Sequence, residues 1–246
     1  MDSRGGGYKV NGSILIISRN SLHLTKLTVK SALAQDLPCD VMVIDNDSHD
    51  GTLQWLKSKS IAWCSTLTQK SLSYCWNKGI KAFFDAGATE VLVCNNDIEL
   101  LPNTYRLLNL VGGPFVTAVG VSLREQFNPV PNLVVPGNSR PHPDFSCYMI
   151  RPEIIDRVGW FDESYFPAYC EDSDYHVRMH KAGINACCVD IPFFHHAAAT
   201  LKNASPPEII KIRRGAEMNR ERFRIQYGCL PGTPEYENLF SQAILV

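Results

Sequence analysis

The sequence has 246 residues, of which 45% are hydrophobic and 20% are charged, as in a globular protein with a substantial core. Its formal net charge of -1 provides no global basic field, which argues against nucleic acid as a partner. No apolar run reaches the roughly 18 residues of a transmembrane helix, and the polar, glycine-rich start is unlike a secretory signal. Nine cysteines, several of them in apolar runs, favour reduced thiols and therefore a cytoplasmic protein.

The first hundred residues alternate short apolar runs with helical patterns. Short continuous apolar runs are typical of buried parallel strands, and four are present, at residues 13–17, 41–44, 61–64 and 91–94. Helical patterns follow the first three runs, starting at Asn20 or Ser21 and then over residues 52–59 and 71–86. This order predicts an α/β fold with a mostly parallel central sheet flanked by helices.

The second half of the sequence is less regular. Five prolines in residues 126–143 predict a long, functional loop. Beyond it we expect strands at residues 145–150 and 185–189, and helices at 152–158, 171–182 and 207–227. The last helix is rich in lysine and arginine; it could touch a membrane surface or a partner, although a solvated face is the simpler interpretation. The predicted organisation is a flexible N-terminus (1–9), an α/β domain (10–205) and a C-terminal helical extension (206–246).

Polar clusters follow two of the predicted strands, at the strand ends where ligands collect in parallel sheets. Asn95, Asn96 and Asp97 come directly after residues 91–94, and the Asp97 carboxylate with neighbouring amide oxygens can hold a divalent cation against phosphates. Asp45, followed by a turn that ends at Gly51, can accept the imide N–H of a uracil or thymine ring. Each cluster alone also fits an ordinary turn.

Two further clusters lie in the second half. Glu171 and Asp172 follow an aromatic stretch, so a fixed carboxylate beside an aromatic wall could act as the base for an acceptor hydroxyl; the same acids also suit a helix N-terminus. His195 follows an apolar strand and could complete a metal site or lie in the core. His176 and His180 have the i, i+4 spacing of zinc ligands, but an adjacent glutamate and a third ligand are missing.

The order of these motifs resembles that of the inverting glycosyltransferases of family 2, which have the GT-A fold, and particularly the rhamnosyltransferase-like branch. The strongest similarity is in VGWFDESYFPAYCEDSDYHVRMHKAG, residues 158–183. Similar segments are SRN at 18–20, VIDNDSHDGT at 43–52, NKGI at 77–80, CNNDIEL at 94–100, PFFHHAAAT at 192–200 and NRERFRIQYG at 219–228. The resemblance covers about residues 10 to 200, with 219–228 as a possible continuation, and the metal motif has one carboxylate where many relatives have two or three.

The resemblance implies a role for each matching residue. The donor, a UDP- or dTDP-sugar, would be bound by Ser18, Arg19, Asp45, Asn77, Asn95, Asn96 and Asp97. Mn²⁺ or Mg²⁺ would be held by Asp97 and His195. Asp172 would be the general base with Glu171 as its partner, and the acceptor would lie against Trp160, Tyr165 and Tyr169. The implied reaction transfers rhamnose or a related hexose to a hydroxyl of a glycan or glycoconjugate.

Two other functions fit parts of the same pattern. A nucleotidyltransferase on a related scaffold would need a basic loop for a triphosphate near the first strand, where only Arg19 is evident. A non-catalytic glycan-binding protein would be expected to have lost Asp97 or the pair of Glu171 and Asp172, and all three are present.

Overall fold

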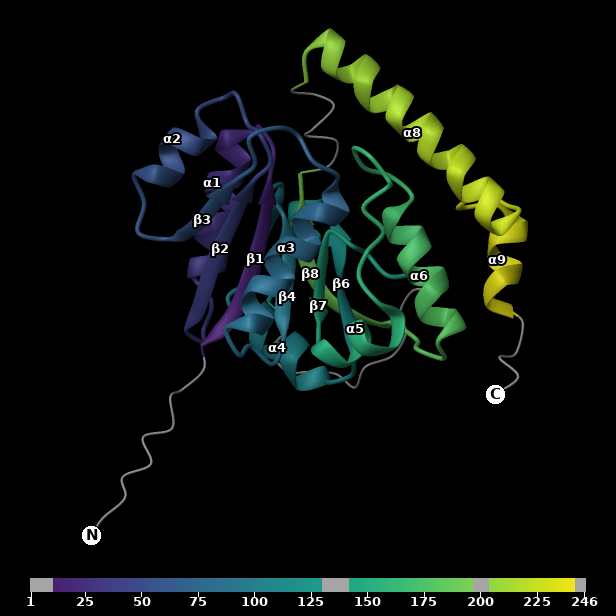
Figure 1. Ribbon diagram of the computed structural model, residues 1–246. Coiled ribbons are helices and arrows are strands. Elements are labelled where there is room, and N and C mark those ends of the chain that lie inside the picture. The colour runs from purple at the N-terminus through teal and green to yellow at the C-terminus, as the bar shows by residue number, and fades with distance from the viewer. Residues whose placement is uncertain (1–10, 130–141, 197–203, 242–246) are drawn as a thin grey trace.

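An eight-stranded sheet forms the centre of the protein and lies between layers of helices (Figure 1). The computed structural model describes residues 11–129, 142–196 and 204–241. The strands are β1 (Gly12–Ser18), β2 (Cys39–Asp45), β3 (Ala62–Ser65), β4 (Val91–Asn95), β5 (Ile98–Glu99), β6 (Phe115–Val121), β7 (Cys147–Ile150) and β8 (Cys187–His195). The helices are α1 (Leu22–Leu33), α2 (Thr52–Lys57), α3 (Leu72–Asp85), α4 (Thr104–Val111), α5 (Pro152–Val158), α6 (Glu171–Lys181), α8 (Pro206–Tyr227) and α9 (Pro234–Ser241), with a 3-10 turn at Arg124–Gln126.

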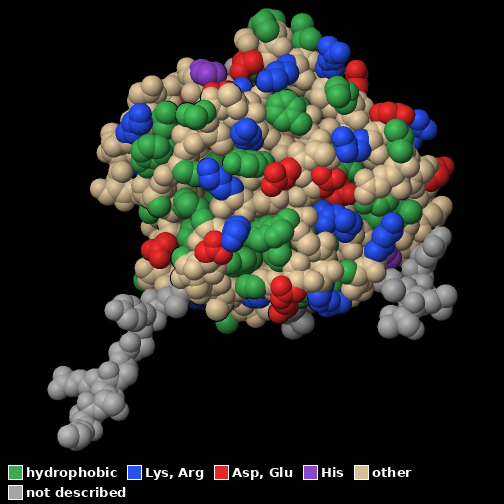
Figure 2. Space-filling model, viewed as in Figure 1, with side chains coloured by type: hydrophobic (Ala, Val, Ile, Leu, Met, Phe, Trp, Pro, Cys, Tyr) green, Lys and Arg blue, Asp and Glu red, His purple; other side chains and the backbone are tan. Residues whose placement is uncertain are grey.

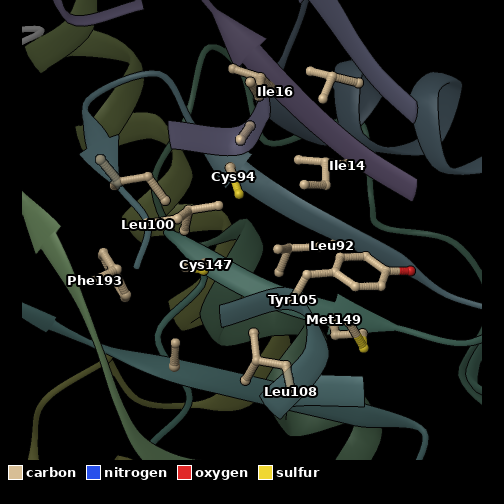
Figure 3. Close-up of a cluster of buried hydrophobic side chains, with 14 of the residues drawn as sticks. Ile14, Ile16, Leu92, Cys94, Leu100, Tyr105, Leu108, Cys147, Met149 and Phe193 are labelled. Atoms are coloured by element: carbon tan, nitrogen blue, oxygen red, sulfur yellow. The ribbon is translucent and has the colours of Figure 1, made fainter. Parts of the chain in front are cut away.

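One half of the sheet is parallel, in the order β3-β2-β1-β4. Alternate side chains of β1 enter different cores, because successive residues of a strand point to opposite faces. Ile14 and Ile16 belong to the core cluster drawn in Figure 3, whereas Leu15 and Ile17 pack with Trp76 on the other face. Both faces are therefore buried, which explains why these strands are continuous apolar runs in the sequence.

The other half of the sheet is mixed. β7 is antiparallel to both β4 and β6, β8 is parallel to β6, and the short β5 pairs antiparallel with β8. The predicted α/β class is confirmed, but the parallel arrangement extends over only four of the seven strand pairings that the structure describes. Strands β5 and β6 and helix α4 are additions to the predicted elements.

Strand β8 is longer than the predicted strand at 185–189 and reaches His195. It continues through Pro192, and its register with β6 shifts between Thr117 and Val119. Proline cannot donate a ladder hydrogen bond, so such an irregularity lets the strand continue past it. Most of the predicted loop at 126–143 lies outside the described residues, as do the N-terminus and Ala197 to Asn203.

The C-terminal helices pack against α6 and the segment that precedes it. α8 begins with a capping box of Ser205 and Glu208, and a third core cluster joins Tyr165 to Phe223 of α8 and Tyr236 of α9. A side chain at Gly215 would meet Pro167 Cδ at 2.3 Å, so glycine permits the close approach of α8. Within the described ranges, no helix combines the length and apolar character needed to cross a membrane.

Candidate active site

A cavity of about 540 Å³ opens at the edge of the sheet where β1, β2 and β4 end and β7 begins. Ile17, Asn46, Asn95 and Ser146 line it from these strands and their connections. Among the described residues, the non-glycine residues with positive φ all lie in turns next to this edge or to α6: Asn20, Ser21, Asp47, Tyr169 and Cys170. Strained backbone of this kind collects at functional sites, which supports the cavity as the candidate active site.

Arg19 lines the cavity and is held firmly in place. Its Nη1 donates hydrogen bonds to the carbonyl oxygens of Asn46 (2.7 Å) and Asp47 (2.8 Å). Its guanidinium group also lies 3.7 Å from Asp47 Oδ2 and 3.6 Å from Glu208 Oε1 of α8. A fixed cation at this edge can face the negative charge of a nucleotide at little further entropic cost.

Ser18 and Asp45 lie behind this wall of the cavity. Ser18 is fully buried, and its Oγ is 2.9 Å from Oγ1 of Thr25. Asp45 is also buried; its Oδ2 accepts a hydrogen bond from Ser65 Oγ (3.0 Å), while Oδ1 has no partner within the described part of the chain. Asp45 therefore keeps an acceptor for a further donor, whereas Ser18 supports the turn.

Asn96 and Asp97 project from the turn between β4 and β5, and both line the cavity together with Asn95. The side-chain amide of Asn96 donates to the carbonyl oxygen of Asn20 and to Thr25 Oγ1, both at 3.0 Å. These bonds join the ends of β1 and β4, so the residues predicted to contact the donor diphosphate share one wall.

Asp97 and His195 form a pair across β5 and β8, with 3.5 Å between Oδ1 and Nε2. The hydrogen bond that His195 donates to Asp97 raises the pKa of His195, and burial opposes this effect. No cluster of three or more His, Cys, Asp or Glu side chains able to hold a metal occurs in the described part of the chain. Mg²⁺ sites commonly use one or two carboxylates together with substrate phosphates and water, and Asp97, which lines the cavity, fits that role. His195 is not among the lining residues and would reach such a cation only from beside Asp97.

Glu171 and Asp172 form the first turn of α6 and line the opposite side of the cavity. Glu171 is only 4% exposed, and its Oε2 has no hydrogen-bond partner among the described residues. Burial, reinforced by the charge of Asp172, raises the pKa of Glu171 well above its usual value. Burial also raises the pKa of Asp172, but the backbone N–H and Oγ of Ser173 donate to Asp172 Oδ1 (2.6 and 3.2 Å) and oppose that rise.

The predicted acceptor aromatics separate in space. Tyr169 lines the cavity next to Glu171. Tyr165 is fully buried in the cluster that holds α8 and α9, and Trp160, which is partly exposed, is not among the residues that line the cavity. Asn77 is also outside the lining. Its side-chain amide donates a hydrogen bond to the carbonyl oxygen of Phe161 (2.9 Å) and accepts one from the backbone N–H of Phe161 (3.0 Å), which fixes the segment before α6.

The cavity also contains residues that the sequence analysis did not single out. Asn46 crosslinks two segments: its Oδ1 accepts from Thr66 Oγ1 (3.1 Å) and from the backbone N–H of Lys70 (2.8 Å). Asp144 lines the cavity just before β7, and its charge raises the pKa of both Asp172 and His195. The only sequence feature that pointed to Asp144 is the proline-rich segment before it, which predicts a functional loop.

We compared the chain with known proteins. No family model matches it. The "low-salt glycan biosynthesis hexosyltransferase Agl10" of Haloferax volcanii is 25% identical over 169 residues, which are 59% of this chain and 55% of that protein. The match therefore spans about half of the relative.

Solved structures resemble the chain more extensively, at low sequence identity. TarS of S. aureus superimposes with a TM-score of 0.57 and 14% identity over 94% of this chain and 47% of TarS; residues 1–349 of TarS have been solved with UDP-GlcNAc. The mannosyltransferase PcManGT of Pyrobaculum calidifontis, solved with GDP-Man and Mn²⁺, gives a TM-score of 0.55 and 13% identity over 96% of this chain and 84% of its own. The chain thus has a glycosyltransferase fold, of the α/β GT-A type that the sequence predicts.

Proposed function

We propose that the protein is an inverting glycosyltransferase that uses a nucleotide-diphosphate sugar. One observation carries the proposal: a single cavity is lined both by Arg19, Asn96 and Asp97 and by the adjacent carboxyl groups of Glu171, which is buried, and Asp172, which is partly exposed. Such a cavity can hold a charged leaving group on one side and an acceptor hydroxyl beside a base on the other.

The two adjacent carboxyl groups can divide the chemistry between them. Burial raises the pKa of both carboxyl groups, but the two hydrogen bonds from Ser173 oppose this rise at Asp172, which makes Asp172 the better candidate for the base. Asp172 takes the proton from the acceptor hydroxyl while that oxygen forms a bond to the anomeric carbon. The bond from this carbon to the diphosphate oxygen breaks on the opposite face, which inverts the anomeric configuration.

The opposite wall stabilises the leaving nucleoside diphosphate. Arg19 provides a fixed positive charge there, and Asn96 keeps the ends of β1 and β4 together. Asp97 and His195 would hold Mn²⁺ or Mg²⁺, which would supply electrostatic stabilisation of the diphosphate. Asp45 lies behind the lining residues, and its buried oxygen, which has no partner among the described residues, would become the contact for the nucleobase once the donor is bound.

The choice of donor and acceptor rests on the relatives. The relative from Haloferax volcanii is named a hexosyltransferase of glycan biosynthesis, and TarS and PcManGT have been solved with nucleotide sugars. We propose a UDP- or dTDP-linked hexose, with rhamnose or a related sugar as the first candidate, and a hydroxyl of a glycan or glycoconjugate as the acceptor.

A thermal-shift screen of nucleotides and nucleotide sugars, with Mn²⁺, Mg²⁺ or EDTA, tests the donor site. A donor at about 100 times its dissociation constant should stabilise the protein by about 2.7 kcal/mol and raise Tm by about 5–10 °C. EDTA or Asp97→Asn should remove most of this rise, while Asp190→Asn, an exposed carboxyl on the strand of His195, should leave it intact. Stabilisation by triphosphates alone would indicate a nucleotidyltransferase, and no shift with any nucleotide would contradict the proposal.

A further inference from the structure

Helix α8 has an outward face whose composition neither the core nor the cavity explains. Ile210, Met218 and Ile225 are 68%, 66% and 75% exposed. Their spacing places them within an arc of about 80° around a helix with 3.6 residues per turn. The opposite face of the helix is already occupied, because Gly215, Asn219 and Phe223 are buried against the domain. The exposed apolar side chains are therefore a second stripe that packs against no part of the described fold.

Positive charge accompanies this stripe. Of the three glutamates of α8, Glu208 pairs with Arg19 of the domain and Glu221 pairs with Arg224. No ion pair with any described residue is formed by Arg213, Arg214, Arg220 or Arg222. The third glutamate, Glu217, forms no ion pair with a described residue, and α8 carries six Lys and Arg side chains against three glutamates, so the helix presents an excess of positive charge. Figure 2 shows green and blue side chains, with red ones among them, along the upper and right margins, where Figure 1 places α8.

The stripe continues onto the neighbouring segment. Phe166 is exposed and lines a groove with Ile210, Met218 and Ile225, and Lys211 Nζ lies 5.4 Å from the centre of the Phe166 ring. Pro167 lines both this groove and the cavity that contains Asp172. A partner or surface bound to the groove would thus lie directly beside the candidate active site.

We propose that the outward face of α8, together with Phe166, docks on an anionic membrane surface. Apolar side chains flanked by long cationic ones fit the boundary between lipid head groups and acyl chains, where arginine stems lie along the apolar region and the guanidinium groups meet lipid phosphates. The unpaired arginines distinguish this occupant from an uncharged apolar partner, because charge complementarity requires an anionic surface. The inference does not depend on the proposed sugar transfer.

Co-sedimentation of the full chain with vesicles tests the proposal. The protein should bind vesicles of phosphatidylcholine mixed with phosphatidylglycerol, bind vesicles of phosphatidylcholine alone more weakly, and dissociate from the mixed vesicles as NaCl is raised. Arg214→Gln combined with Arg222→Gln should weaken binding by about 25-fold, from about fivefold for each cation near an anionic surface. Met218→Gln combined with Ile225→Gln should weaken it by about tenfold through lost apolar insertion.

Matched controls lie on other elements. Leu110 of α4 is 62% exposed, and Lys57 ends α2, so Leu110→Gln and Lys57→Gln should leave vesicle binding unchanged. Circular dichroism should show that each variant is folded. The proposal is overturned if the wild-type chain fails to bind the anionic vesicles at low salt, or if the controls weaken binding as much as the α8 variants. It is also overturned if Met218→Gln with Ile225→Gln instead separates a stable dimer into monomers.

Discussion

The two walls of the cavity are held in different ways. The wall at the ends of β1, β2 and β4 is held by hydrogen bonds to neighbouring segments, made by the side chains of Arg19, Asn46 and Asn96. At the start of α6, Tyr169 and Cys170 both have positive φ, and Glu171 keeps a buried oxygen without a described partner. Positive φ also occurs at Asn20, Ser21 and Asp47 beside the first wall, so strain does not distinguish the two. The difference is that hydrogen bonds tie the first wall together, as suits binding, whereas the second carries carboxyl groups with raised pKa, as suits chemistry.

Loss of the proposed base should have the largest effect and should distinguish the contribution of the α6 side to turnover from that of the opposite wall to donor binding. Asp172→Asn should lower kcat by about 10²–10⁴-fold, because general base catalysis contributes that much, and leave donor stabilisation of Tm unchanged. Steady-state kinetics with the donor found by the thermal-shift screen would measure it. Asp190→Asn is the matched control and should retain full activity. A turnover of Asp172→Asn within twofold of wild type would show that another group is the base.

Substitutions at two glycines test how tightly the protein is packed behind each wall. A methyl group at Gly79 would meet Leu15 of β1 at 2.4 Å, and one at Gly215 would meet Pro167 at 2.3 Å. Overpacking should lower the free energy of unfolding of both Gly79→Ala and Gly215→Ala by about 1–3 kcal/mol in urea denaturation. Only Gly215→Ala should also raise KM for the acceptor, because Pro167 lines the cavity. Equal kinetic effects of the two variants would show that α8 does not shape the acceptor side.

A buried histidine should make the α6 side the more acid-sensitive one. Burial, with smaller effects of His142 and His180, lowers the pKa of His176 to about 3. The unfolded chain therefore binds more protons than the folded one between about pH 3 and 6.5, so stability falls as pH drops through this range. At pH 5 the loss from this group should be about 2 kcal/mol relative to pH 8.

The variant His176→Phe checks the assignment of this loss. Phenylalanine does not titrate and can stack on Phe240, as the imidazole ring does at 4.3 Å. Urea denaturation at pH 8 and pH 5 should show a smaller acid-induced loss for His176→Phe than for wild type. The same loss in both proteins would assign the acid sensitivity to other groups.

The sequence predicted the parallel half of the sheet well, because its information is local. The strands β1 to β4 are apolar runs, and helices with clear 3.6-residue periodicity separate them. Asn96 and Asp97 could be placed at the cavity edge for the same reason, since the residue after a parallel strand lies at its carboxyl end. Asp172 and Glu171 were found through the order of motifs, and the structure places both in the cavity.

The mixed half depends on pairings between distant segments, which periodicity does not reveal. β7 lies between β4 and β6 in the reverse direction, and β5 has only two residues. The same limit applies to individual side chains. Tyr165 belongs to an aromatic stretch that suggests a sugar-binding wall, but Phe223 and Tyr236, about 60 and 70 residues later, bury it. Asn77 lies in a recognisable motif, yet its bonds to Phe161 span 84 residues.

The reversed direction of β7 has a consequence for how such a protein can be diversified. β6 ends at Val121 and β7 begins at Cys147, and their antiparallel pairing brings both residues to the cavity edge of the sheet. The connection therefore leaves the sheet and returns to it at the same edge, so a change in its length leaves the strand register intact at a small entropic cost. Exchange of residues 122–143 should thus alter the cavity lining at His142 and Pro143 while the strands keep their pairing.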